Sequence, residues 1–513
     1  MASKLLSTKP IDELLKSAEG EKGGLRRALG PVNLITFGIG AIIGAGIFVL
    51  TGQAAALYAG PAIVLSFILC GIGSGFAGLC YAEFASLIPI AGSAYTYAYA
   101  TLGEIFAWII GWALILEYSF GAATVASGWA GYLSSLLADF NIHIPPQLDA
   151  VPGTKLIFYQ GTWQKASNVL PAIEKAGINP ATLPHATGIF NLVALLVILV
   201  ITAILVVGVK ESANLNSTFV TIKISVLLVF IGLAAIFVMH HSHIVDMNWH
   251  PFLPPNTGKF GQYGWSGILR GASVIFFAYI GFDAVSTTAQ EARNPQKDMP
   301  IGIIGSLVIS TVFYIIVAGL LTAVVPYTSL DVADPVAVGV AATGVRWGSI
   351  LVNLGAVAGI GSVMLVMLLG QSRIFWTMSQ DGLLPGWAGK VHHRFRTPYI
   401  SSIVVGIPVA LAAAFLPINE LADLVNIGTL SAFTIVCLGV WVLRRKQPDL
   451  HRPFKTPWVP LVPILGACIS LGLMAGLPSL TWIAFLSWGT FGLLIYFFYS
   501  RRHSQLRQQQ TGD

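Results

Sequence analysis

The sequence predicts an all-α protein that crosses a lipid bilayer many times. Of its 513 residues, 55% are hydrophobic and 10% are charged, and the mean hydropathy is +0.77. A soluble chain of this length would have too apolar a surface to remain in solution. Apolar runs of about 20 residues, the length that spans a bilayer as a helix, recur along the whole chain. The fold class is therefore a polytopic membrane protein.

Twelve apolar runs are expected to form membrane-spanning helices. A segment between the second and third runs, 89–103, is small, aromatic and uncharged, and predicts an interfacial or re-entrant helix. The runs lie near 33–58, 61–87, 104–137, 187–208, 218–239, 267–290, 301–325, 347–380, 398–416, 422–443, 459–478 and 480–499. The chain then divides into an N-terminal tail (1–30), helices 1–5 (31–239, with a long outer segment at 138–186), helices 6–10 (267–443), helices 11–12 (459–499) and a C-terminal tail (500–513).

The basic residues indicate the orientation of the chain. An even number of spans places both termini on one side of the membrane. That side carries six basic residues in the first 30 and the run Arg444-Arg445-Lys446. Positive charge marks cytosolic loops, so we expect cytosolic termini and a multi-pass protein of the cell (plasma) membrane. The first 30 residues lack the apolar core of a signal peptide.

Cysteine and histidine offer little chemistry. The four cysteines all lie in apolar segments, and their spacing matches no disulfide framework or metal site: Cys70, Cys80, Cys437 and Cys468. Histidines cluster at 240–250, but no cysteine or carboxylate spacing accompanies them, so a solvated loop is the favoured interpretation. No metal, cofactor or nucleic acid is expected, and no nucleotide-binding P-loop is present.

Two apolar runs contain residues that a membrane helix normally excludes. Residues 38–48 read G-I-G-A-I-I-G-A-G-I-F, and residues 276–286 read F-F-A-Y-I-G-F-D-A-V-S, with a carboxylate at Asp283. Glycine is a poor helix former, and a charge in hydrocarbon costs about 3 kcal/mol or more. Unwound backbone at this depth is tolerated only where protein buries it or a cavity hydrates it. A pair of interrupted helices in corresponding halves indicates the substrate site of a transporter.

With these motifs the chain resembles the amino acid-polyamine-organocation superfamily, and within it the bacterial relatives of the cationic amino acid transporters. The resemblance rests on both interrupted segments and on three further motifs: Y-A-E-F-A-S-L-I-P-I-A-G-S-A-Y-T-Y (81–97), E-A-R-N-P-Q-K-D-M-P (291–300) and S-Q-D-G-L-L-P (379–385). It implies a LeuT-like fold, in which five helices repeat in inverted orientation and two helices follow. It also implies amino acid transport by alternating access, with helices 1 and 6 broken. The long outer segment departs from the family pattern.

The first break is the candidate site for the substrate carboxylate. Ile43, Gly44, Ala45 and Gly46 would offer free backbone N–H groups and the positive end of a half-helix. The alternative is close helix packing of the GxxxG kind, since Gly40 and Gly44 have that spacing. The matching second break favours binding.

The second break is the candidate site for the substrate amino group. Unwound carbonyls at Phe277, Ala278 and Ile280 would bind the ammonium, and the resemblance places Phe277 at an aromatic gate. It also aligns Met367 with a residue of the side-chain pocket. A methionine offers no partner for a cationic side chain, so small or medium neutral amino acids are expected. Ordinary core packing is the alternative for both side chains.

Three ionisable residues within the spans are candidates for proton coupling: Lys223, Glu117 and Asp283. In relatives, a lysine at the position of Lys223 replaces a bound sodium ion, so its amine could carry the driving proton. The alternatives are a structural ion pair or a snorkelling side chain. Glu117 and Asp283 are candidate partners of Lys223, proton relays or helix caps.

Position alone suggests inner-gate ion pairs at Glu83 and between Glu291 and Arg293. The expected partners are an amino acid, protons and the lipid bilayer, with no nucleic acid. A monomer is expected, and no disulfide-linked heavy subunit, because the outer segment has no cysteine. The alternatives are a cationic amino acid transporter, an exchanger, a polyamine carrier and a nutrient receptor without flux. Enzyme activity is not expected.

Overall fold

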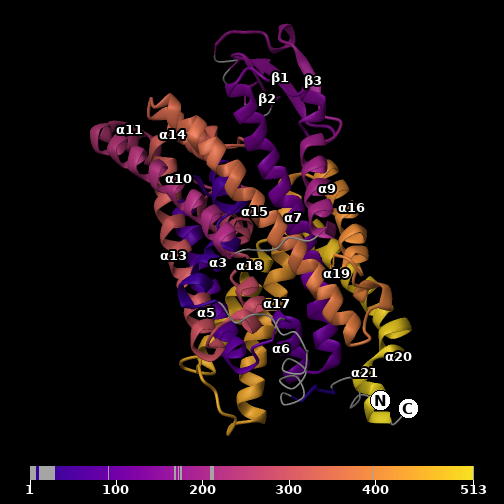
Figure 1. Cartoon of the computed structure of the whole chain (residues 1–513). Coiled ribbons are helices and arrows are strands. Elements are labelled where there is room, and N and C mark those ends of the chain that lie inside the picture. Colours follow the sequence, from indigo (N-terminus) through magenta and orange to yellow (C-terminus); the bar gives the residue numbers. More distant parts are fainter. Residues whose placement is uncertain are drawn as a thin grey trace.

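The computed structural model describes residues 7–10, 29–90, 92–166, 169–170, 173, 176–207, 213–395 and 397–511. They form an elongated bundle of helices with a small sheet at one end (Figure 1). The helices are α3 (Pro31–Ile42), α4 (Thr51–Ala54), α5 (Ile63–Leu87), α6 (Ser93–Thr101), α7 (Glu104–Asp139), α9 (Leu192–Val207), α10 (Ala213–His240), α11 (Ser242–Trp249), α12 (Gly264–Ile275), α13 (Pro295–Val324), α14 (Pro335–Ala342), α15 (Arg346–Gln380), α16 (Tyr399–Phe415), α17 (Ile418–Lys446), α18 (Leu461–Ala475), α19 (Ser479–Ile495), α20 (Arg501–His503) and α21 (Gln505–Thr511).

Shorter 3-10 and π-helical segments connect or interrupt these helices. Three of them shape the site: η1 (Gly46–Leu50), η6 (Phe276–Tyr279) and η7 (Asp283–Glu291). The others are η2 (Ala55–Ala59), η3 (Gly60–Ala62), η4 (Pro146–Leu148), η5 (Pro180–Thr182), η8 (Tyr327–Ser329), η9 (Gly386–Gly389) and η10 (Tyr496–Ser500).

Eight helical stretches of the described chain are long and apolar enough to cross a membrane: Gly46–Leu87, Glu104–Asp139, Ser217–His240, Gly264–Glu291, Pro295–Val324, Trp347–Gln380, Ile418–Lys446 and Ser479–His503. Four shorter apolar helices accompany them: Pro31–Ile42, Leu192–Val207, Tyr399–Phe415 and Leu461–Ala475. On α10, Leu228 and Ile236 are 53% and 56% exposed. Large apolar side chains on the outside of a helical bundle are expected where lipid, rather than water, surrounds it. The prediction of a polytopic, mainly helical membrane protein is confirmed.

The helices pack in two groups. In the first, α13 packs along α3 and α5, and α12 packs against α5. In the second, α15 packs along α7, and α16 packs against α9 and α7. Helix α10 contacts both groups, through α3 and α13 on one side and α15 on the other. The interrupted segments lie where the first group meets α7 and α15.

The segment between α7 and α9 adds a small sheet to the predicted all-α membrane protein. It contains an antiparallel sheet in the order β2-β1-β3, with β1 Lys155–Tyr159, β2 Thr162–Lys165 and β3 His185–Thr187. Gln160 and Gly161 both have positive φ, as a two-residue hairpin turn requires. Ile157, Val169 and Ile173 form a small core of this unit. This short hairpin was not predicted from the sequence.

The segment 89–103 contains α6, as predicted, and the side chains of this helix are buried. Of the histidines near 240–250, His240 ends α10 and His243 lies on α11, rather than in a loop. His241 and His250 flank α11. The four cysteines are free, and the described residues contain no group of three or more possible ligands that could hold a metal.

Most of the predicted N-terminal tail lies outside the described residues, as do Lys210, Arg396 and residues 512–513. The parts of both tails that are described meet on Glu104. Its backbone N–H donates to Ser7 O at 3.1 Å, and its carboxylate accepts from Arg507 at 2.7 Å. Helix α21 lies at the end of the bundle opposite the sheet (Figure 1).

Candidate functional site

The first interruption separates α3 from η1. Helix α3 ends at Ile42, and Ile43 is extended, with φ −75° and ψ 102°. After the break, Phe48 N–H donates to Gly44 O at 3.3 Å, and the chain continues as the π-helical segment η1, in which Thr51 N–H donates to Gly46 O. Among the described residues, the N–H groups of Gly44 and Ala45 have no backbone acceptor. The break therefore presents donors of the kind that bind an anion at the start of a helix.

The second interruption separates α12 and η6 from η7. Ile280 is extended, and Gly281 has a φ of +118°, a conformation that favours glycine. A Cβ on Gly281 would lie 2.8 Å from the carbonyl carbon and oxygen of Ala41, so the close approach of α3 also requires glycine here. Both breaks predicted from the sequence are present.

The two interruptions lie against each other. A Cβ on Gly46 would lie 2.3 Å from Cα of Ala278, so one backbone touches the other directly. From α13, the hydroxyl of Tyr314 lies 2.7 Å from Ala278 O and 3.0 Å from Ile42 O. The structure thus brings the predicted carboxylate-binding and amino-binding segments into one place.

The predicted substrate-binding residues are all buried. Phe277 is 5% exposed and Met367 2%, and the others are less exposed than that. Val363 of α15 packs on the first break, with Cγ2 3.1 Å from the position of a Cβ on Gly44. Phe277 O accepts from Ile280 N–H at 3.2 Å, and each carbonyl oxygen has a second lone pair for a ligand. A ligand can reach this place only when the surrounding helices move.

Lys223 does not pair with either predicted acid. Its fully buried ammonium donates to Gly40 O, in the last turns of α3, at 2.6 Å, and the described ion pairs do not include it. Gly359 on α15 makes room for it, because a Cβ there would lie 2.5 Å from Lys223 Cγ. Of the two candidate partners, neither Glu117 nor Asp283 forms an ion pair with Lys223 among the described residues. Because α3 ends at Ile42, Gly40 O is free of the helical hydrogen bond within the described chain and accepts from the lysine instead.

The two acids lie elsewhere in the site. Asp283 accepts from the hydroxyl of Tyr118 at 3.2 Å and from the N–H of Gly281 at 3.3 Å. Glu117, next to Tyr118 on α7, is fully buried, and within the described part of the chain neither of its carboxylate oxygens has a hydrogen-bond partner. An ionised carboxylate in such surroundings is costly, so Glu117 is a polar group that packing alone does not explain.

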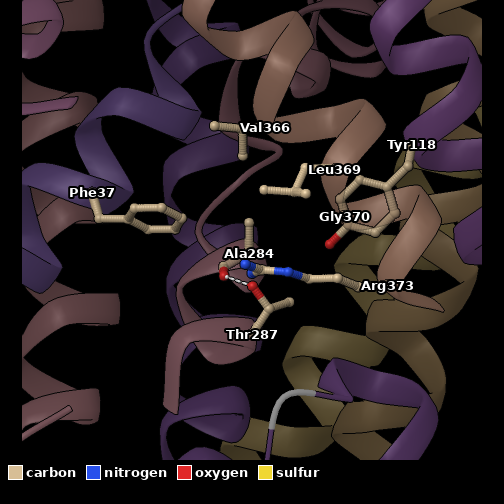
Figure 2. Close-up of a pocket in the computed structure, with 8 residues that line it drawn as sticks. All are labelled: Phe37, Tyr118, Ala284, Thr287, Val366, Leu369, Gly370 and Arg373. Atoms are coloured by element: carbon tan, nitrogen blue, oxygen red, sulfur yellow. Dashed lines mark hydrogen bonds between the residues drawn. The ribbon is translucent and has the colours of Figure 1, made fainter. Parts of the chain in front are cut away.

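A small pocket lies beside Asp283, between the segment before the first break and the segment after the second. Figure 2 shows the guanidinium of Arg373, from α15, directed at Ala284 and Thr287 of η7. Sequence reasoning assigned no role at the site to Arg373 or Tyr118, although a basic residue within an apolar helix is a signal for one. The lining consists of Phe37, Tyr118, Ala284, Thr287, Val366, Leu369, Gly370 and Arg373.

Buried ion pairs lie outside the breaks. Glu83 accepts two hydrogen bonds from Arg444 of α17, at 2.8 and 2.9 Å, so the expected ion pair at Glu83 is present. Arg270 of α12 makes a bidentate pair with Asp423 of α17, at 3.0 and 2.7 Å, and this pairing was not predictable from the sequence. Near Glu291, the backbone of Ala292 forms a bridge to Leu29. The pair of Glu291 with Arg293 stays a prediction.

Known proteins with similar sequences are transporters, which agrees with a binding site at the two breaks. Residues 29–500 match the family model described as amino acid permease. Two relatives from Bacillus subtilis (strain 168), a methylthioribose transporter and the branched-chain amino acid permease BcaP, are each 43% identical over 99% of this chain and 100% of their own length. A vacuolar cationic amino acid transporter 4 of Arabidopsis thaliana is 32% identical over 87% of this chain and 68% of its own. These relatives are permeases and transporters, not enzymes. The chain belongs to the amino acid permease family, within the amino acid-polyamine-organocation superfamily.

Proposed function

We propose that the chain is a secondary active transporter that carries small or medium neutral L-amino acids together with protons, by alternating access. One observation carries the proposal: the unwound backbones of two distant helices touch at Gly46 and Ala278 inside the bundle. Interrupted helices are costly in a membrane protein, and a site for a polar ligand accounts for both of them.

An amino acid matches the groups that the breaks present. Its carboxylate would accept from the N–H groups of the segment Ile43–Gly46, of which those at Gly44 and Ala45 have no backbone acceptor. Its ammonium would donate to carbonyls of the segment Phe277–Ile280. Its side chain would extend toward Met367, which is buried on α15. An apolar thioether there favours a neutral side chain over a cationic one.

The proposed architecture is the LeuT-like arrangement of two inverted five-helix repeats, with twelve membrane helices in all. The grouping of α3, α5, α12 and α13 on one side, and of α7, α9, α15 and α16 on the other, supports it. In the proposed transport cycle these groups move relative to each other, and the buried site opens alternately to the two sides. The cell (plasma) membrane, cytosolic termini and a monomer without a disulfide-linked subunit complete the proposal.

Proton coupling is proposed to run through Lys223. Its charged amine donates to Gly40 O, close to the first break, and a neutral amine would hold this carbonyl less strongly. Protonation of Lys223 would therefore change the position of α3 and with it the site. Asp283 and Glu117 would accept or relay protons nearby, where Tyr118 connects α7 to η7.

Uptake into proteoliposomes tests the function. Radiolabelled alanine is supplied with an imposed pH gradient to the native chain, to Lys223→Ala and to the control Lys259→Ala, whose lysine is exposed. We expect gradient-driven accumulation in the native chain and the control, and none in Lys223→Ala. Uptake only against preloaded amino acid would instead show an exchanger, and gradient-driven uptake that survives in Lys223→Ala would refute the role of the lysine.

Competition by unlabelled compounds tests the substrate class. The names of the relatives suggest a panel of leucine, arginine and methylthioribose beside alanine. Neutral amino acids should compete and arginine should not. Stronger competition by arginine would indicate a cationic amino acid transporter, and stronger competition by methylthioribose would indicate that a neutral amino acid is not the preferred substrate. Alanine binding without flux would indicate a receptor.

A further inference from the structure

We propose that Tyr314 is a positioning residue for substrate binding, whose hydroxyl holds the two interrupted segments in register. The inference rests on the proposed function and adds a residue that sequence reasoning did not single out. Tyr314 lies on α13, which is uninterrupted, and its side chain is fully buried. Its hydroxyl lies 2.7 Å from Ala278 O in the second break and 3.0 Å from Ile42 O at the end of α3.

Both carbonyls need a partner because the helices stop there. In a continuous helix, each carbonyl accepts from the amide four residues further on, and the interruptions remove that amide. A tyrosine hydroxyl carries one proton, so it can donate to only one of the two carbonyls at a time. Both carbonyl oxygens lie within hydrogen-bond distance of this one hydroxyl, so they face a common point. The oxygen that does not accept the hydroxyl proton keeps its acceptor capacity for the three donors of an ammonium group.

The ring of Tyr314 is fixed independently of its hydroxyl. It packs against Phe67 of α5 with ring centroids 5.4 Å apart, and against Tyr279 of η6 at 5.4 Å and an interplanar angle of 87°. Tyr496 of η10 is also fully buried, and its hydroxyl donates to Glu104 Oε1 at 2.8 Å, outside both breaks. Tyr314→Phe thus removes one hydroxyl and keeps the ring, and Tyr496→Phe is a control that removes a buried hydroxyl away from the proposed binding segments.

The test uses the full-length protein in lipid nanodiscs, with two measurements for each variant. The first is the affinity for alanine, and the second is hydrogen exchange of peptides that cover residues 41–48 and 277–284 without substrate. A buried hydrogen bond contributes about 1 kcal/mol, which corresponds to roughly fivefold in an equilibrium. We expect Tyr314→Phe to weaken alanine binding about fivefold and to speed exchange in both peptides, while Tyr496→Phe changes alanine affinity less than twofold.

The two measurements separate this inference from the proposed function. Native protein that does not bind alanine would refute the proposed substrate, and the exchange data would still decide the positioning role. Unchanged exchange of both break peptides in Tyr314→Phe would overturn the positioning role. Equal losses of affinity in Tyr314→Phe and Tyr496→Phe would also overturn it, because a general packing defect would then explain the effect.

Discussion

Gly46→Ala should abolish transport without unfolding the protein. The added Cβ would lie 2.3 Å from Cα and 2.4 Å from Cβ of Ala278. Carbon atoms in contact are normally about 3.5 Å apart or more, so the two breaks would have to separate by more than 1 Å. Both contacting atoms belong to or adjoin backbone, which cannot turn away as a long side chain would.

The expected magnitude follows from this displacement. Overpacking by one methyl group costs about 1–3 kcal/mol of stability. A 1 Å displacement of groups that must engage one small molecule can cost about 100-fold in activity. We therefore expect a folded variant with uptake lowered about 100-fold, because a carboxylate and an ammonium on one amino acid would no longer reach both breaks.

The assay compares Gly46→Ala with Gly232→Ala, since a Cβ at Gly232 on α10 would meet no other atom within 4 Å. Both are examined for monodispersity and thermal unfolding in detergent, and then for alanine uptake after reconstitution. Uptake by Gly46→Ala within a few fold of the control, at normal expression, would refute the reasoning. The breaks would then not form a shared site of fixed dimensions.

Two further predictions concern polar groups outside the breaks. Asp423→Asn should destabilise the protein by about 3–5 kcal/mol, because it leaves the buried guanidinium of Arg270 without its carboxylate, and a double replacement with apolar residues should recover much of this loss. Thermal unfolding checks this, and equal midpoints for the single and double variants would contradict it. Burial raises the pKa of Asp149 to about 6, despite a hydrogen bond from Ser134 that acts in the opposite direction. The folded protein therefore favours the protonated carboxyl, and its stability should fall as pH rises from about 4, the pKa in an unfolded chain, to about 6. Asp149→Asn should remove this dependence, and a difference in unfolding midpoint between the variant and the native chain that stays constant from pH 4 to pH 8 would contradict it.

Much of the architecture is encoded locally in the sequence. Apolar runs predict helices for a membrane environment because backbone hydrogen bonds must be satisfied within each segment. The two breaks were also predictable, since glycine and a carboxylate are both unfavourable in a lipid-exposed helix, and Ile43 and Gly281 do interrupt their helices. The sheet between α7 and α9 was missed because its signal is a hairpin of two strands of four and five residues.

The partners of the polar groups were decided by the tertiary structure. The sequence located Lys223, Glu117 and Asp283 within spans, but proximity in space, not composition, gives Lys223 the carbonyl of Gly40 and leaves the Glu117 carboxylate without a hydrogen bond from any described residue. Likewise, Tyr314 looks like one more aromatic residue of an apolar helix until α13 is packed against both breaks. Hydropathy and helix propensity depend on neighbours along the chain, so the sequence alone determined that this is a helical membrane protein with two breaks. Hydrogen bonds between helices depend on which faces meet, and only the packed structure determines that.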